Sequence, residues 1–291
     1  MKATLGEKWF YGLNYVILTL AALSCLLPIL NIFALSFSDS NSILNGSVNI
    51  WPKGFNLEAY ETLISGTPIV RAFMNSLLIT VAGVAFSLLF TILAAYPLSR
   101  RGFTGRRVLT LMIVFTMLFN GGLIPNYLVV NGLGLVNTYW ALWLPALVSA
   151  FNMMIMKNYF ENLPDEIEEA ARMDGCGEIR LILRIVLPLS LPMLATIALF
   201  YAVYFWNAFL QVMIYIQDTR LLNMTVLVQN MIRSQSMMQF INNVQPEDMQ
   251  AIAPESVKSA GIVVMIIPLM LVYPFLQKYF VKGVMIGAVK G

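Results

Sequence analysis

The chain concentrates ionisable side chains in the segment Glu161–Pro188, where the acidic run Asp165–Glu169 is followed by three arginines. The sequence contains no histidine, which removes the commonest general base and metal ligand and every Ser-His or Cys-His nucleophile pair. Cys25 lies in an apolar run and Cys176 in a polar loop, so the two form no metal or redox motif. We therefore expect no catalytic residue and no metal site, and we interpret the charged segment as a surface that binds a partner.

Two short helices are expected to carry these charged groups. Pro164 and Asp165 are typical of a helix start, and Gly175 is typical of a helix end. A second helix is predicted after Gly175, because apolar residues recur there at helical spacing on a face that leaves Arg180 and Arg184 aside: Ile179, Ile182, Leu183 and Val186. An amphipathic loop lying on lipid headgroups would show the same periodicity, so the pattern alone leaves both interpretations open.

The rest of the chain has the composition of membrane-spanning helices. Hydrophobic residues make up 59% and charged residues 11% of the sequence, against roughly 25% charged residues in soluble domains. Five intervals without a charged residue are long enough to span a bilayer: residues 9–38, 72–99, 108–156, 185–217 and 259–277. The third has about twice the length of one span and contains several turn-forming residues. We therefore predict two helices within it, and an all-α integral membrane protein with about six transmembrane helices.

The distribution of cations predicts the topology. Most of the 18 lysines and arginines, including the four arginines of the short loop 100–107, lie inside the cell if the N-terminus is cytoplasmic. An even number of spans then places both termini in the cytoplasm. The first apolar run, Leu13–Phe37, is longer than the roughly 7–15-residue core of a secretory signal, so we interpret it as a retained span. The net charge of +3 is scattered along the chain, which argues against nucleic-acid binding.

The charged segment resembles the EAA signature of ATP-binding-cassette (ABC) importer permeases. Glu169-Ala170-Ala171 is followed by Gly175 and then by Ile185-Val186-Leu187-Pro188. Further matches extend the resemblance over most of the chain: Asn158–Phe160, Leu163–Pro164, Trp206–Asn207 and Gly283–Gly291. In these positions the chain resembles the binding-protein-dependent carbohydrate permeases of the MalG type, which have a MetI-like fold, and Asn120–Pro125 is similar to their Lpl/Ytc-type branch.

The resemblance implies one permease subunit of an ATP-driven importer for a carbohydrate, specifically an oligosaccharide. Residues 1–12 would be a cytoplasmic N-terminus and residues 13–291 a type-1 ABC transmembrane domain, with a coupling loop at 161–188 and a C-terminal tail at 283–291. The implied partners are a second permease in a heterodimer, a homodimeric or heterodimeric ABC ATPase and an extracytoplasmic solute-binding protein. ATP and Mg would bind to the ATPase and no cofactor to this chain, which would be a multi-pass protein of the bacterial inner or plasma membrane.

Two sets of residues would contact the ATPase if the family's roles are carried over by position. The coupling set is Glu169, Ala170, Ala171, Asp174, Gly175, Ile185, Leu187 and Pro188. Within it, Glu169 would meet a basic residue, and the small residues would permit a close backbone approach. The tail set, which would reach between the two ATPase subunits, is Gly287, Val289, Lys290 and Gly291.

Passage of a sugar requires aromatic and hydrogen-bonding side chains along the spans. The candidates for a substrate pathway are Asn126, Tyr127, Asn152, Tyr204, Asn207 and Gln211. Ordinary interhelical hydrogen bonding, or an aromatic belt at the membrane interface, is the alternative for each of them and the more frequent case. The resemblance also implies that the other permease subunit contributes most of the sugar site.

A self-sufficient secondary transporter or channel is the alternative function. Such proteins normally place ionisable residues within their spans for ion or proton coupling, and the charge-free intervals contain none. An intramembrane enzyme would need an Asp-based or Ser-based site, for which the sequence offers no recognisable set. The absence of a Gly-x-x-x-x-Gly-Lys-Ser/Thr motif fits a permease whose energy comes from another chain.

Overall fold

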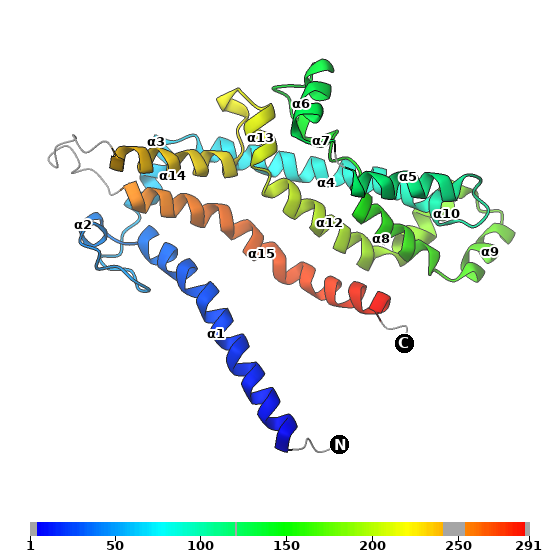
Figure 1. Ribbon diagram of the computed structural model, residues 1–291, viewed down its shortest axis with the longest axis horizontal. Coiled ribbons are helices and arrows are strands. Elements are labelled where there is room, and N and C mark those ends of the chain that lie inside the picture. Colours follow the sequence, from blue (N-terminus) through cyan, green and yellow to red (C-terminus); the bar gives the residue numbers. More distant parts are fainter. Residues whose placement is uncertain (1–4, 120, 241–253, 289–291) are drawn as a thin grey trace. The chain divides into compact units, whose positions relative to one another are not determined.

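A computed structural model describes residues 5–119, 121–240 and 254–288, and every regular element in these ranges is a helix (Figure 1). The predicted all-α fold class is therefore confirmed. The chain forms two compact units, which consist of residues 1–70 with 228–267 and of residues 71–227 with 268–291.

The first unit contains a folded segment directly after its long apolar helix. Asp39 Oδ2 accepts a hydrogen bond from the Ser42 amide at 3.1 Å, and the Tyr60 hydroxyl donates to Ser36 Oγ at 2.9 Å. The first bond caps a short helix, and the second connects the end of α1 to α3. In chain order the helices of this unit, the later two in part, are α1 (Leu5–Ser36), α2 (Ser40–Leu44), α3 (Glu58–Gly66), α14 (Met224–Phe240) and α15 (Pro254–Ala288).

The second unit contains the charged segment, between α8 and α12. Its helices in chain order are α4 (Ile69–Ser99), α5 (Arg106–Leu118), α6 (Leu123–Gly132), α7 (Trp140–Trp143), α8 (Ala150–Glu161), α9 (Asp165–Met173), α10 (Glu178–Leu181), the π-helix η1 (Ile182–Val186), α11 (Leu187–Leu189), α12 (Leu191–Trp206), α13 (Leu210–Tyr215) and the 3₁₀-helix η2 (Thr219–Leu221).

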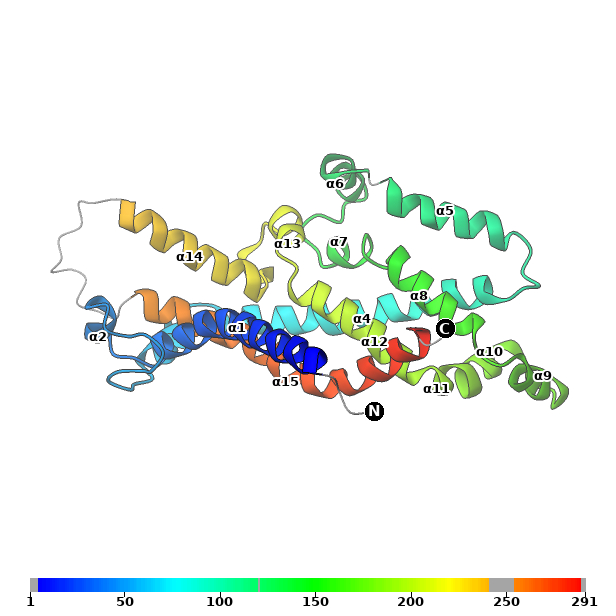
Figure 2. The same ribbon diagram turned by 60° about the horizontal axis from the view of Figure 1, so that its bottom comes forward.

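The core of the second unit lies where α4, α8 and α12 run side by side (Figures 1 and 2). A Cβ on Gly83 of α4 would lie 2.7 Å from the ring of Phe205 on α12, so the glycine lets the two helices approach closely, as small residues do in membranes. Thr91 Oγ1 and the Tyr201 hydroxyl are hydrogen-bonded at 2.7 Å, and the Ser149 amide donates to the same hydroxyl at 3.0 Å. These three polar groups are therefore paired within the protein, as polar groups in a membrane interior should be.

Among the residues that the structure describes, three helices are long and apolar enough to cross a membrane, with spans at Gly6–Ser36, Ile69–Ser99 and Pro254–Pro274. Two sharply bent helix pairs raise the number to as many as five if each pair forms one span. These pairs are α5 with α6, and the segment Glu178–Leu189 with α12, which bends by 83°. These helices support a multi-pass membrane protein. The predicted number of about six spans and the predicted cytoplasmic position of both termini are not confirmed by them and stay predictions.

The interval 108–156 differs from the two spans predicted for it. The structure has four helical segments there, α5 to α8, none longer than 13 residues. The backbone turns through positive φ angles at Gly122, Gly134 and Asn137, which interrupts a continuous helix. Asn137 tolerates this conformation because its Oδ1 accepts the amides of Gln217 and Asp218 at 3.0 and 2.8 Å.

Candidate functional site

The charged segment is folded, and its first helix begins and ends where the sequence predicts. Helix α9 starts at Asp165, directly after Pro164 at the N-cap position. At its other end the Gly175 amide donates to Arg172 O and the Cys176 amide to Ala171 O, both at 3.0 Å. This pair of bonds is a Schellman motif, which places Gly175 at φ +75°.

The positive φ of Gly175 therefore favours glycine at this position. A Cβ at this position would meet no described atom of this chain within 4 Å, so a side chain causes no clash inside the subunit. We expect Gly175→Val to destabilise the end of α9 by about 1–2 kcal/mol, and Gly175→Asn to be tolerated because Asn adopts the left-handed region more easily. Limited proteolysis of the loop in the purified protein would measure both effects. Equal protease sensitivity of the two variants would contradict the backbone explanation.

Helix α9 has one face packed against the protein and one face open. Glu168 and Ala171 are only 8% and 6% exposed, whereas Met173 is 88% exposed. We call the exposed side, with Glu166, Glu169, Ala170 and Met173, the outward face of α9. It contains two residues of the predicted coupling set.

The residues of the predicted coupling set differ in their exposure. Glu169, Ala170, Asp174, Gly175 and Pro188 are exposed. Ile185 and Leu187 are half-buried. Ala171 is 6% exposed and packs in the core of this chain, and its part in a close backbone approach by the ATPase stays a prediction. Its side chain packs on the back of α9, opposite the outward face.

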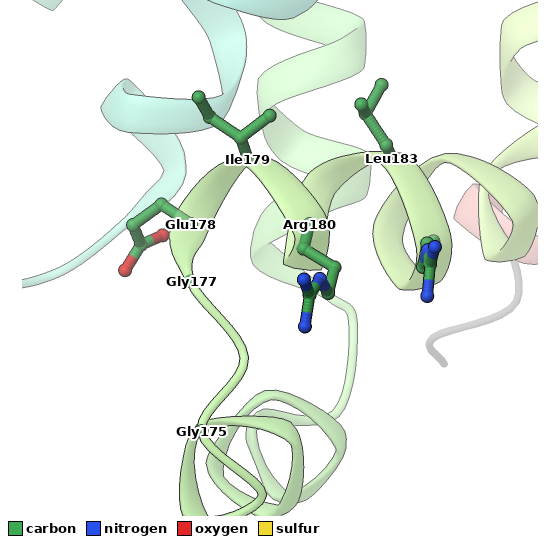
Figure 3. A pocket seen from close by; sticks show the side chains of 7 residues that line it. Gly175, Gly177, Glu178, Ile179, Arg180 and Leu183 are labelled. Atoms are coloured by element: carbon green, nitrogen blue, oxygen red, sulfur yellow. The ribbon is translucent and has the colours of Figure 1, made fainter.

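The second half of the segment does not form the single apolar face that its periodicity predicts. Leu181 and Val186 are fully buried, while Ile179 and Leu183 are 75% and 60% exposed. The π-helix η1 explains the difference: it has more residues per turn than an α-helix, which rotates Val186 away from Ile179 and Leu183 and toward the buried side. Figure 3 shows Ile179 and Leu183 projecting from one side of this segment, and Arg180 from the other.

A surface hollow lies beside this turn. Its lining combines two glycines, an acid, two apolar side chains and two arginines: Gly175, Gly177, Glu178, Ile179, Arg180, Leu183 and Arg184 (Figure 3). Exposed apolar side chains next to charges are typical of a surface that binds another protein.

A closed set of contacts holds α9 and α10 against the end of α4. Arg100, just beyond α4, forms an ion pair with Glu168 on the packed face of α9, and its guanidinium lies 4.5 Å over the Tyr96 ring. On α10, Glu178 pairs with Arg172 of α9 at 2.6 Å and accepts a hydrogen bond from the Tyr96 hydroxyl at 3.4 Å. No motif in the sequence predicts this network. A local signal for it is that Glu168 and Ala171, three residues apart, share one face of α9.

The Arg100–Glu168 pair is a direct contact between Nη2 of Arg100 and Oε1 of Glu168. The neighbouring Nε of Arg100 is buried and has no hydrogen-bond partner among the described residues. Burial raises the pKa of the Glu168 carboxyl above its ordinary value, and the Arg100 charge acts in the opposite direction. Each group therefore depends on the other to remain buried.

A second charged cluster joins the beginning of α5 to the end of α8. Glu161 pairs with Arg106 and, at 2.7 Å, with Lys157. The side chain of Lys157 is only 9% exposed. The single carboxylate of Glu161 thus forms ion pairs with two cations.

The structure brings together only some of the predicted substrate-pathway residues. The Gln211 amide donates to the Tyr204 hydroxyl at 3.4 Å, and Asn207 between them donates to Val203 O of its own helix at 2.9 Å. Tyr127 stacks on Tyr215 with ring centroids 6.2 Å apart.

The remaining pathway candidates and the tail lie elsewhere. Asn126 is exposed on α6, and Asn152 is buried in the first turn of α8. Gly287 is in the last turn of α15, whereas Val289, Lys290 and Gly291 lie outside the described residues.

With its membrane-length apolar helices and a folded charged loop, the chain has the fold of an integral membrane protein. It belongs to the family described as the binding-protein-dependent transport system inner membrane component, whose model matches residues 87–286.

Individual relatives agree with this family. The chain is 42% identical to the polygalacturonan/rhamnogalacturonan transport system permease protein YtcP of Bacillus subtilis, over all of both chains. It is 45% identical to protein LplC of the same organism, over 91% of this chain and 90% of that one. A solved structure of a bacterial ABC transporter involved in the import of the acidic polysaccharide alginate is 33% identical and superposes with a TM-score of 0.87, over 96% of this chain and 99% of that chain. The predicted family, fold and branch are confirmed.

Proposed function

We propose that this chain is one permease subunit of an ABC importer for an oligosaccharide, and that the loop 161–188 transmits the work of a separate ATPase. The outward face of α9 carries this proposal, because it presents Glu169, Ala170 and the largely exposed Met173 on a helix whose back is anchored through Arg100 to α4. Because the packed face of α9 is attached to the end of α4 and its outward face is exposed, a movement of a partner bound to the outward face can be transmitted to the membrane spans.

The proposed assembly contains a second permease, an ATPase dimer made of one or two kinds of chain, and an extracytoplasmic solute-binding protein. ATP and Mg would bind to the ATPase, and this chain would supply no catalytic group. The assembly would lie in the bacterial cytoplasmic membrane with both termini of this chain inside the cell. Its relatives in systems for polygalacturonan, rhamnogalacturonan and alginate make fragments of acidic polysaccharides the first substrates to test.

Transport measured in proteoliposomes tests this proposal. The purified assembly, loaded with ATP and Mg inside and supplied with its solute-binding protein outside, should accumulate a labelled oligogalacturonate. Omission of ATP or of the binding protein should abolish uptake. Uptake by this chain alone, driven by an ion gradient, would instead support the secondary transporter.

A further inference from the structure

The beginning of α5 combines a basic hollow with an exposed apolar helix. The hollow has a volume of about 590 Å³, within the range of sites that hold small ligands. Its lining contains three cations and three apolar side chains among other residues: Phe103, Gly105, Arg106, Arg107, Val108, Thr110, Leu111 and Lys157. This hollow is separate from the one beside α10.

The charge of the hollow is unbalanced. Arg106 and Lys157 share the single carboxylate of Glu161. Arg107 is exposed and forms no ion pair with any residue that the structure describes. Three positive charges thus face one negative charge, which favours an anionic occupant.

The apolar part of the site runs along α5. No residue of this helix is buried within the described chain. Leu111 lies four residues after Arg107, and Phe115 lies eight residues after Arg107. All three residues therefore share one face of the helix. Leu111 and Phe115 are 60% and 57% exposed. One continuous face therefore leads from a cation to apolar surface, at the point where an apolar helix begins.

We propose that this face and hollow bind an anionic phospholipid, with its phosphate beside Arg107 and an acyl chain along Leu111 and Phe115. An amphiphile matches both parts of the site, whereas a free phosphate would leave the apolar face uncovered. Basic pockets at the cytoplasmic ends of membrane helices are suited to anionic headgroups. The proposal does not depend on the transported substrate or on the ATPase.

Lipid retention by the purified transporter assembly tests this site. The assembly is placed in nanodiscs of phosphatidylcholine containing phosphatidylglycerol, and the bound lipids are counted by native mass spectrometry. Arg107→Gln should lower retention of phosphatidylglycerol about fivefold, the factor that one basic residue near an anionic surface contributes. Arg101→Gln is the matched control, because Arg101 is an exposed arginine of the same loop outside the lining, and it should leave retention unchanged.

Three results would overturn the proposal. Equal losses in the two variants would indicate diffuse attraction of the loop to the bilayer. Displacement of phosphatidylglycerol by millimolar inorganic phosphate would indicate a site for the free anion. Absence of any preference for phosphatidylglycerol in the wild-type assembly would indicate that another subunit covers α5. A thermal unfolding curve of Arg107→Gln in phosphatidylcholine alone, expected to match that of the wild type, shows that the variant is folded.

Discussion

Glu168→Ala is expected to destabilise the protein more than Arg100→Ala, although the two residues form one ion pair. After the loss of Glu168, the Arg100 guanidinium remains largely buried and cannot give up its proton. Removal of one partner from a fully buried pair costs about 3–5 kcal/mol, and the 20% exposure of Arg100 should place this variant near the lower end. After the loss of Arg100, Glu168 can take up a proton, which limits the cost to about 1–2 kcal/mol.

A double-mutant cycle measures the coupling within this pair. Arg100→Met combined with Glu168→Met removes both charges and keeps apolar volume, so it should recover most of the stability that either single variant loses. The measurement is thermal unfolding of the purified protein in one detergent. The control is Arg172→Met, because that pair is half-exposed and should be worth less than about 1 kcal/mol. Additive losses at positions 100 and 168 would contradict the buried pair.

The burial of Glu168 should also make the stability of the protein depend on pH. The pKa of Glu168 is raised in the folded protein, so the folded state binds more protons than the unfolded state between the two pKa values. The stability contribution of this group is therefore complete below the ordinary pKa of a glutamate and declines as the pH rises through the folded value. Glu168→Gln should remove this decline from the unfolding curves.

Glu169→Arg is expected to reduce transport at least tenfold while the subunit remains folded. Glu169 is exposed and pairs with no cation in the described parts of the chain, so reversal of its charge should not disturb the permease itself. If it meets a basic residue of the ATPase, the reversed charge replaces an attraction with a repulsion, and a loss of about 1.4 kcal/mol corresponds to each tenfold reduction. The measurement is ATP-dependent uptake in proteoliposomes beside the thermal stability of the same preparation.

Glu61→Arg is the matched control for this variant. Glu61 is an exposed acid on α3 in the first unit, and the same reversal there should leave the association with the ATPase intact. An acidic substitution of the contacting ATPase residue should restore uptake to Glu169→Arg. Unchanged uptake by Glu169→Arg would show that the outward face of α9 does not couple the two proteins.

Much of the fold could be predicted because its signals are local. The ends of α1 and α4 lie close to the charges that bound their apolar runs, since a charged side chain is costly inside a bilayer. The end of α9 at Gly175 follows from a single backbone requirement. The interval 108–156 was harder to predict, because Asn137 adopts its turn only with help from the amides of residues 217 and 218, 80 residues away.

The sequence by itself determined the membrane class, the position of the charged loop, the bounds of α9 and the family, because hydropathy, capping and motif spelling depend on neighbouring residues. Only the tertiary structure decided that Ala171 faces the core, that Glu168 lies against Arg100, and that Ile179 and Leu183 are exposed. These features depend on contacts between segments that are distant in the sequence, and on the π-helix η1. The burial of a side chain is set by such tertiary contacts, so neither residue spacing nor composition predicts it.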